Sequence, residues 1–163
     1  MIDTGLRRLL SPLFGPARRP DGFRPRGTSS RVSRLAERYD VEVDAALRRL
    51  WPKARIYRDR EFTRDRADFL LVVRGRGVMV ETKVKSDPGV FRGSTLPPLL
   101  DRLQRDGRRL IVVLNQGDPA PARALVAEKL GDRGRVVVWS GPQHDADLHD
   151  AVEALLRQMV RHQ

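Results

Sequence analysis

The sequence predicts an α/β fold in which a mixed sheet is flanked by helices. Three strand-like runs follow one another early in the chain, and two more alternate with helical patterns later on. The chain has 163 residues, of which 40% are hydrophobic, which is enough apolar material for one core. The expected strands are Arg55–Arg58, Ala67–Val73, Val78–Lys85, Leu110–Leu114 and Arg135–Trp139.

Together with the helical patterns, these strands give the expected order of elements along the chain: one helix, a three-strand meander, and then alternating helices and strands. Apolar residues recur at three- and four-residue steps from Ser33 to Leu50, which fits one helix or two abutting ones ended by Pro52. A leucine stripe from Leu96 to Leu103 predicts the next helix. The last two expected helices are Ala120–Leu130, which Gly131 closes, and Asp147–Met159.

The N-terminal part of the chain differs in composition from the rest. We expect residues 1–32 to form a basic arm rich in proline and arginine, and residues 33–163 to form one domain. Through Arg38 there are nine arginines and three acidic residues, a net +6 of the total +11. Such an arm suits contacts with a phosphate backbone, although a solvated tail without a specific role is an equal alternative.

The overall charge favours a polyanionic partner, most simply nucleic acid. Lysine and arginine number 32, against 21 aspartate and glutamate residues. The same arginine bias also arises from GC-rich codon usage, because only four of the basic residues are lysines. We expect DNA as the partner.

Several classes of protein are disfavoured by what the sequence lacks. There is no cysteine, which excludes disulfide scaffolds and thiolate sites, and all three histidines lie in the last 20 residues. No apolar run is long enough to span a membrane, and the first apolar stretch is too short for a secretion signal. We therefore expect a cytoplasmic protein with no membrane partner.

The chemistry is concentrated in a predicted hairpin. Closing it around Gly75-Arg76 places Asp68 opposite Lys83 and Leu70 opposite Glu81. Asp68, Glu81 and Lys83 then share the less apolar face of the two strands. A register slip of two residues preserves this shared face, whereas a slip of one breaks it.

Two carboxylates and a lysine in this arrangement suit metal-assisted hydrolysis of a phosphodiester. Asp68 and Glu81 offer the oxygen ligands that Mg²⁺ or Mn²⁺ prefers. The ammonium of Lys83 is placed to orient or deprotonate a water, or to neutralise developing charge. The alternative is a surface ion-pair ladder worth about 0–1 kcal/mol.

These residues also resemble a known family. Ala67-Asp68 followed by Glu81-Thr82-Lys83 after a glycine hairpin resembles the PD-(D/E)XK nuclease superfamily, with Ala67 in place of the family proline. Small archaeal Holliday-junction resolvases look closest. The likeness covers roughly residues 33–140 in architecture, but its sequence motif is only a few residues. It implies a restriction-endonuclease-like mixed sheet with an αβββαβ core and an αβ/α extension, and it raises a homodimer as a candidate state.

The resemblance implies two further site residues. The family usually adds a metal-associated glutamate from the first helix, for which Glu42 is the preferred candidate and Glu37 the alternative. Some branches add a glutamine on the helix after the motif, a place that Gln104 is positioned to fill. Both Glu42 and Gln104 also fit as ordinary surface residues of their helices.

Basic side chains near the predicted site are candidates for phosphate contacts. Arg58 and Arg60 flank the hairpin on one side, and Lys85 and Arg92 follow the motif. A solvated strand end is an equal interpretation for the first pair.

The function we predict is a Mg²⁺-dependent deoxyribonuclease. The first alternative is a non-catalytic nucleic-acid-binding or assembly module on the same fold. A third interpretation is a small basic RNA-associated protein, in which Asp68, Glu81 and Lys83 do not converge for function.

Overall fold

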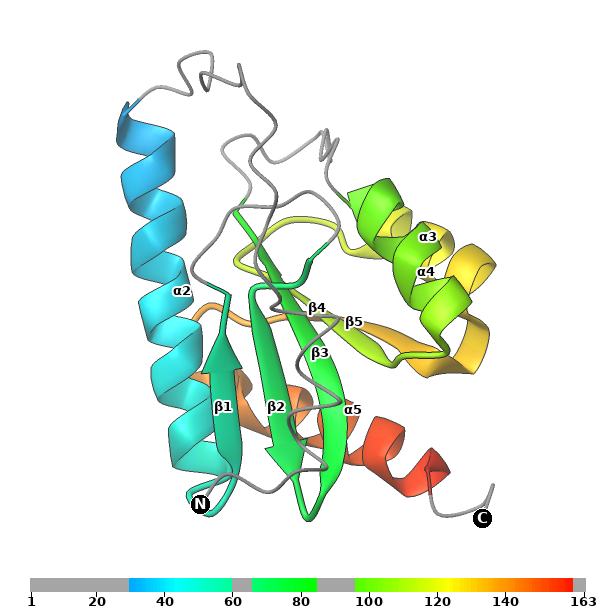
Figure 1. The fold of residues 1–163 in the computed structure, drawn as a ribbon. Helices are drawn as coiled ribbons and strands as arrows, with labels where there is room; N and C mark the ends of the chain where they lie inside the picture. The colour runs from blue at the N-terminus through cyan, green and yellow to red at the C-terminus, as the bar shows by residue number, and fades with distance from the viewer. Residues whose placement is uncertain (1–29, 60–65, 85–95, 160–163) are drawn as a thin grey trace, which may run out of the picture.

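The computed structural model describes residues 30–59, 66–84 and 96–159, which form a five-stranded mixed sheet between two layers of helices (Figure 1). The strands lie across the sheet in the order β1-β2-β3-β4-β5. The predicted α/β class is therefore confirmed. The strands are β1 (Arg55–Arg58), β2 (Phe69–Val73), β3 (Arg76–Lys83), β4 (Leu110–Leu114) and β5 (Gly134–Val138), and the helices are α2 (Ser30–Leu50), α3 (Leu96–Asp106), α4 (Ala120–Leu130) and α5 (Asp145–Gln158).

The first three strands form the predicted antiparallel meander, but the hairpin between β2 and β3 has another register. Val73 pairs with Arg76 and Phe69 pairs with Val80, so the turn consists of Arg74 and Gly75. Both turn residues have positive φ, 50° and 78°, as a two-residue type I′ turn requires. The register predicted with a turn at Gly75-Arg76 is therefore wrong by two residues.

The pairing keeps Asp68 next to Glu81, but Asp68 precedes β2 and its carboxylate bonds to the side chain of Thr82, on the α2 side of β3. Continuing the pairing of Phe69 with Val80 by one residue brings Asp68 opposite Glu81 instead of Lys83. β3 also ends at Lys83, two residues earlier than predicted.

The second half of the sheet is parallel. β3 pairs with β4, and β4 pairs with β5, through the crossover helices α3 and α4. Leu110–Leu114 is buried at every position, as an uninterrupted apolar strand predicts. The helix Ala120–Leu130 has its predicted bounds, and Gly131 follows it with a φ of 56°.

Both faces of the sheet are covered, so the domain has two cores. One core lies under α2 and α5, where Tyr39, Val43 and Leu47 pack with Val78 and Val80. The other lies under α3 and α4, where the leucines of α3 pack with Leu70 and Met79. The face that holds Glu81 is therefore part of a second core, so the less apolar side of β3 is covered as well.

α2 is one continuous helix of 21 residues, which settles the choice between one helix and two. It begins at Ser30, and residues 1–29 of the predicted arm lie outside the described part of the chain. Within the described ranges, no helix is both long and apolar enough to cross a bilayer.

Candidate active site

The predicted acidic and basic residues lie at one edge of the sheet. The register aligns Lys83, Leu114 and Val138, so the carboxyl ends of the three parallel strands meet there. Asp68 immediately precedes β2, which runs antiparallel to β3, and so it lies at the same edge. In open α/β sheets this edge is where ligands usually bind.

Asp68 is held in place by Thr82. The main-chain N–H of Thr82 donates to Oδ2 of Asp68 at 2.7 Å, and the Thr82 hydroxyl donates to the same oxygen at 2.8 Å. Both bonds end on Oδ2. Within the described residues, no hydrogen bond to Oδ1 is found.

Asp40 of α2, and not Glu42, reaches this cluster. The Thr82 hydroxyl is also within hydrogen-bonding distance of Oδ1 of Asp40, to which it donates as the alternative to Asp68, and the Asp40 side chain is only 17% exposed. Burial and the charge of Asp68 raise the pKa of Asp40, although the bond from Thr82 and the nearby Arg58 oppose the rise.

The structure does not bring Glu42 to Asp68. Its carboxylate pairs with Arg38 at 3.0 Å and is 46% exposed, and Glu37 is exposed as well. The reason is helical rotation: Tyr39 and Val43 face the core, so Asp40 and Glu42 flank this buried stripe on opposite sides of the helix, and the Asp40 side is the one turned toward Thr82. The expected position of Glu42 in the cluster is therefore corrected to Asp40.

Glu81 is the most buried charged group of the site. Its side chain accepts a hydrogen bond from Nζ of Lys83 at Oε1, while the buried Oε2 has no partner among the described residues. The residue is only 4% exposed. Burial, together with the charge of Asp68, raises the pKa of Glu81 to about 8, against the opposing effect of Lys83.

Asp68 and Glu81 are the two carboxylates of this edge that could hold a divalent cation. Asp68 and Glu81 each have one oxygen engaged by the protein and one that the described residues leave without a hydrogen bond. No group of three or more metal-ligating side chains is found in residues 30–59, 66–84 and 96–159. Two carboxylates are nevertheless sufficient for Mg²⁺, which commonly keeps several waters and binds through one or two carboxylates and a substrate phosphate.

Arg58 lies beside the acidic cluster. Its Nη2 is 3.6 Å from Oδ2 of Asp40, and its guanidinium lies 5.7 Å from the ring centroid of Phe69. The other predicted phosphate contacts, Arg60, Lys85 and Arg92, fall outside the described residues.

Gln104 lies away from the cluster. α3 starts near the site edge and runs back along the sheet, so Gln104 is eight residues, or about 12 Å, from the start of the helix. It is exposed near the opposite edge. The expectation that Gln104 joins the site is therefore not supported by its position.

Sequence reasoning missed two members of the cluster, Asp40 and Thr82. Helical periodicity limits the candidates of α2 to the acids that flank the buried stripe of Tyr39 and Val43, but it does not choose Asp40 over Glu42. For Thr82 the signal is strand alternation. Because Thr82 lies between Glu81 and Lys83, its side chain faces α2 when theirs face the layer of α3 and α4.

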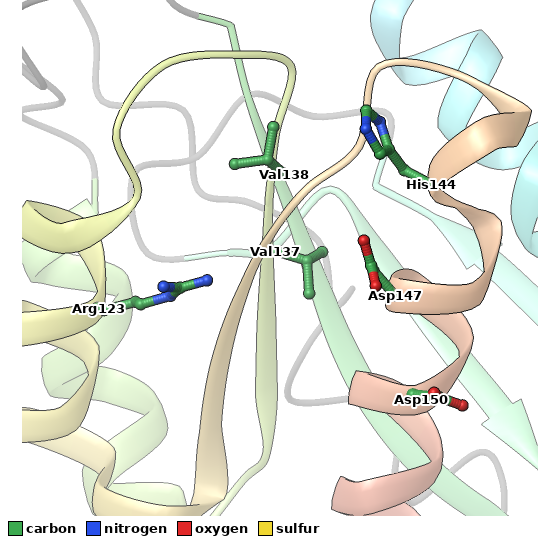
Figure 2. Close-up of a pocket in the computed structure, with 6 residues that line it drawn as sticks. All are labelled: Arg123, Val137, Val138, His144, Asp147 and Asp150. Atoms are coloured by element: carbon green, nitrogen blue, oxygen red, sulfur yellow. The ribbon is translucent and has the colours of Figure 1, made fainter.

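A separate pocket lies at the outer edge of the sheet between α4 and α5. Figure 2 shows Arg123 of α4 on one side and Asp147 and Asp150 of α5 on the other, with residues of β5 between them. None of its lining residues belongs to the predicted site, and β5 is two strands away from β3. The lining residues are Arg123, Val137, Val138, His144, Asp147 and Asp150.

Comparison with known proteins found little similarity. No family model and no curated protein matches the sequence. The fold is similar to the solved structure of Pyrococcus furiosus SfsA in complex with Ca²⁺, with 19% sequence identity and a TM-score of 0.36. The matched region covers 77% of this chain and 53% of that chain, so this chain spans about half of that protein. A likeness at this level assigns neither a fold family nor an activity.

Proposed function

We propose that this chain is a metal-dependent nuclease that hydrolyses DNA phosphodiester bonds on a restriction-endonuclease-like fold. Its centre is formed by Asp68, Glu81 and Lys83. The observation that carries the proposal is the pair of carboxylates on adjacent strands, each with one oxygen that the described residues leave without a hydrogen bond, next to a lysine.

Each residue has a distinct task in this proposal. Asp68 and Glu81 hold Mg²⁺ or Mn²⁺, and a cation of this kind polarises a phosphoryl oxygen and offsets the charge of the transition state. Lys83 balances the charge of the buried Glu81, and its ammonium is positioned to orient the attacking water or to stabilise developing negative charge.

The proposed substrate is DNA because the chain carries a net charge of +11. Arg58 pairs with Asp40 beside the site, and a substrate phosphate would compete with that carboxylate for its guanidinium. Arg60, Lys85 and Arg92 remain predicted backbone contacts.

A second candidate is a non-catalytic nucleic-acid-binding module. It is favoured by the contact between Lys83 and Glu81, which gives Oε1 of the buried Glu81 a hydrogen-bond partner without a metal. The two candidates make opposite predictions about metal dependence.

The test is single-turnover cleavage of branched, single-stranded and duplex DNA with Mg²⁺, Mn²⁺ or chelator, beside a binding titration. Asp68→Asn and Glu81→Gln should abolish cleavage and leave DNA binding intact or stronger, because the repulsion of phosphate falls. Glu42→Gln is the matched control, since Glu42 is exposed and pairs with Arg38. Cleavage that persists in Asp68→Asn or survives chelation would reject the proposal, and binding without any cleavage would favour the module.

A further inference from the structure

Glu81 and Thr82 are the two buried polar side chains among the described residues, and they are neighbours on β3. Glu81 faces the layer of α3 and α4, whereas Thr82 faces α2 and is 8% exposed. Burying a polar group is costly unless it is hydrogen-bonded, and Thr82 meets this requirement with carboxylates from two other elements.

We infer that Thr82 is a positioning residue that fixes the orientation of Asp68 for a divalent cation, with Asp40 as a second support. This inference rests on the proposed function. It assigns a task to the residue between Glu81 and Lys83, which does not itself offer a carboxylate or an ammonium.

The geometry explains why Asp68 needs such a support. The terminal torsion of an aspartate is broad, so a carboxylate at the start of a strand is poorly oriented without partners. The main-chain N–H of Thr82 lies 2.7 Å and its hydroxyl 2.8 Å from Oδ2 of Asp68, and these two contacts restrict that rotation. The main-chain N–H is present with any residue at position 82 other than proline, so the hydroxyl is the part that the side chain contributes.

Asp40 fixes the hydroxyl in turn. A hydroxyl has a single proton, so Thr82 donates to one of the two carboxylates at a time, while both stay within hydrogen-bonding distance of Oγ1. The result is a chain of contacts from Arg58 through Asp40 and Thr82 to Asp68. It connects α2 and the end of β1 to the metal-facing carboxylate.

The effect of removing such a supporting group has a known size. Removing a group that orients a metal ligand typically lowers metal affinity or activity about 10–100-fold. Thr82→Val keeps the shape and removes the hydroxyl, and Thr82→Ser keeps the hydroxyl and removes the methyl group. The pair separates the hydrogen bond from the packing.

The experiment measures Mn²⁺ affinity of the full-length chain by calorimetry, with circular dichroism to verify folding and cleavage as a second readout. We expect Thr82→Val to bind Mn²⁺ about 10–100-fold more weakly and to need correspondingly more metal for half-maximal cleavage. Thr82→Ser should stay close to wild type in both. If Thr82→Val does not fold, Thr82→Ala replaces it, because alanine also lacks the hydroxyl and places no apolar branch between the carboxylates.

The outcomes separate this inference from the proposed function. Wild-type affinity in folded Thr82→Val or Thr82→Ala overturns the positioning role while the nuclease stands. Weak binding in Thr82→Ser, equal to that of the variant without a hydroxyl, overturns it as well. A wild-type chain that neither binds Mn²⁺ nor cleaves DNA rejects the proposed function and the positioning role together.

Discussion

The hydroxyl of Tyr39 donates a 2.6 Å hydrogen bond to the carbonyl oxygen of Trp139, one hundred residues further along the chain. The two rings also lie 6.2 Å apart at an angle of 45°. This contact fixes α2 to the end of β5, and Asp40 is the next residue of the helix. Burial, with the charges of Glu42 and Asp40, raises the pKa of Tyr39, so the phenol stays protonated as a donor.

Tyr39→Phe should lower the free energy of unfolding by about 1–3 kcal/mol, because it leaves the buried Trp139 carbonyl without this donor. Urea unfolding is the measurement. Tyr57→Phe is the matched control, since Tyr57 is half-buried on β1 and its hydroxyl has no such bond among the described residues. Equal stabilities of the two variants would contradict the role of the Tyr39 bond.

Glu81 should make the metal-free protein less stable as the pH rises. Its pKa is raised from an ordinary 4.5 to about 8 in the folded state, so between these values the folded chain binds more protons than the unfolded chain. The unfolding free energy therefore falls by up to about 1.4 kcal/mol per pH unit in this window and levels off above pH 8.

Glu81→Gln removes that titration and should flatten the profile, making the variant the more stable protein at pH 8 without metal. Urea unfolding from pH 5 to pH 9 in chelator measures the effect. Glu42→Gln should keep the wild-type slope, because Glu42 is exposed. Parallel profiles for wild type and Glu81→Gln would show that Glu81 does not titrate in this range.

Lys83→Ala should slow cleavage by about 10²–10⁴-fold, since the variant lacks a positioned charge-stabilising or proton-transferring group. Mn²⁺ binding should largely remain, because Asp68 and Glu81 are unchanged. Single-turnover kinetics and calorimetry on the same preparation test both statements. A variant that cleaves at the wild-type rate would limit Lys83 to balancing the charge of Glu81.

Removing residues 1–29 should weaken DNA binding and flatten its salt dependence without changing the cut site. This segment contains six arginines and two aspartates, a net +4. The slope of log affinity against log salt should fall by about 0.9 for each phosphate that the arm neutralises on duplex DNA. Binding titrations at several salt concentrations measure it, and an unchanged slope would assign the arm another task.

The sequence predicts the fold better than it predicts the site. The apolar run Leu110–Leu114 and the helix Ala120–Leu130 are recovered with their bounds because local pattern alone determines them. The hairpin register depends on Arg74, a residue other than glycine that adopts a φ of 50°, and propensity does not reveal this. The choice between Asp40 and Glu42 depends on how α2 is rotated against the sheet.

Glu81 and Thr82 show a second limit of prediction from local pattern. Alternation places them on opposite faces of β3, but it does not reveal that helices cover both faces. Burial, and with it the raised pKa of Glu81, arises only when α3 and α4 close over that side. The alternating polar and apolar residues of β3 are therefore consistent with a polar face that is exposed to solvent as well as with one that is buried under helices.

The opposite facing of Glu81 and Thr82 means that the two halves of the centre are embedded in different cores. Substitutions in the leucines of α3 change the surroundings of Glu81, while substitutions at Val43 or Leu47 act on the support that Asp40 and Thr82 provide. Asp68 and Glu81 interact across the sheet edge, so a double-mutant cycle on metal affinity measures how strongly the two cores are coupled through them. The surroundings of Glu81 and the support of Asp68 are thus built by different parts of the chain that meet only at this edge.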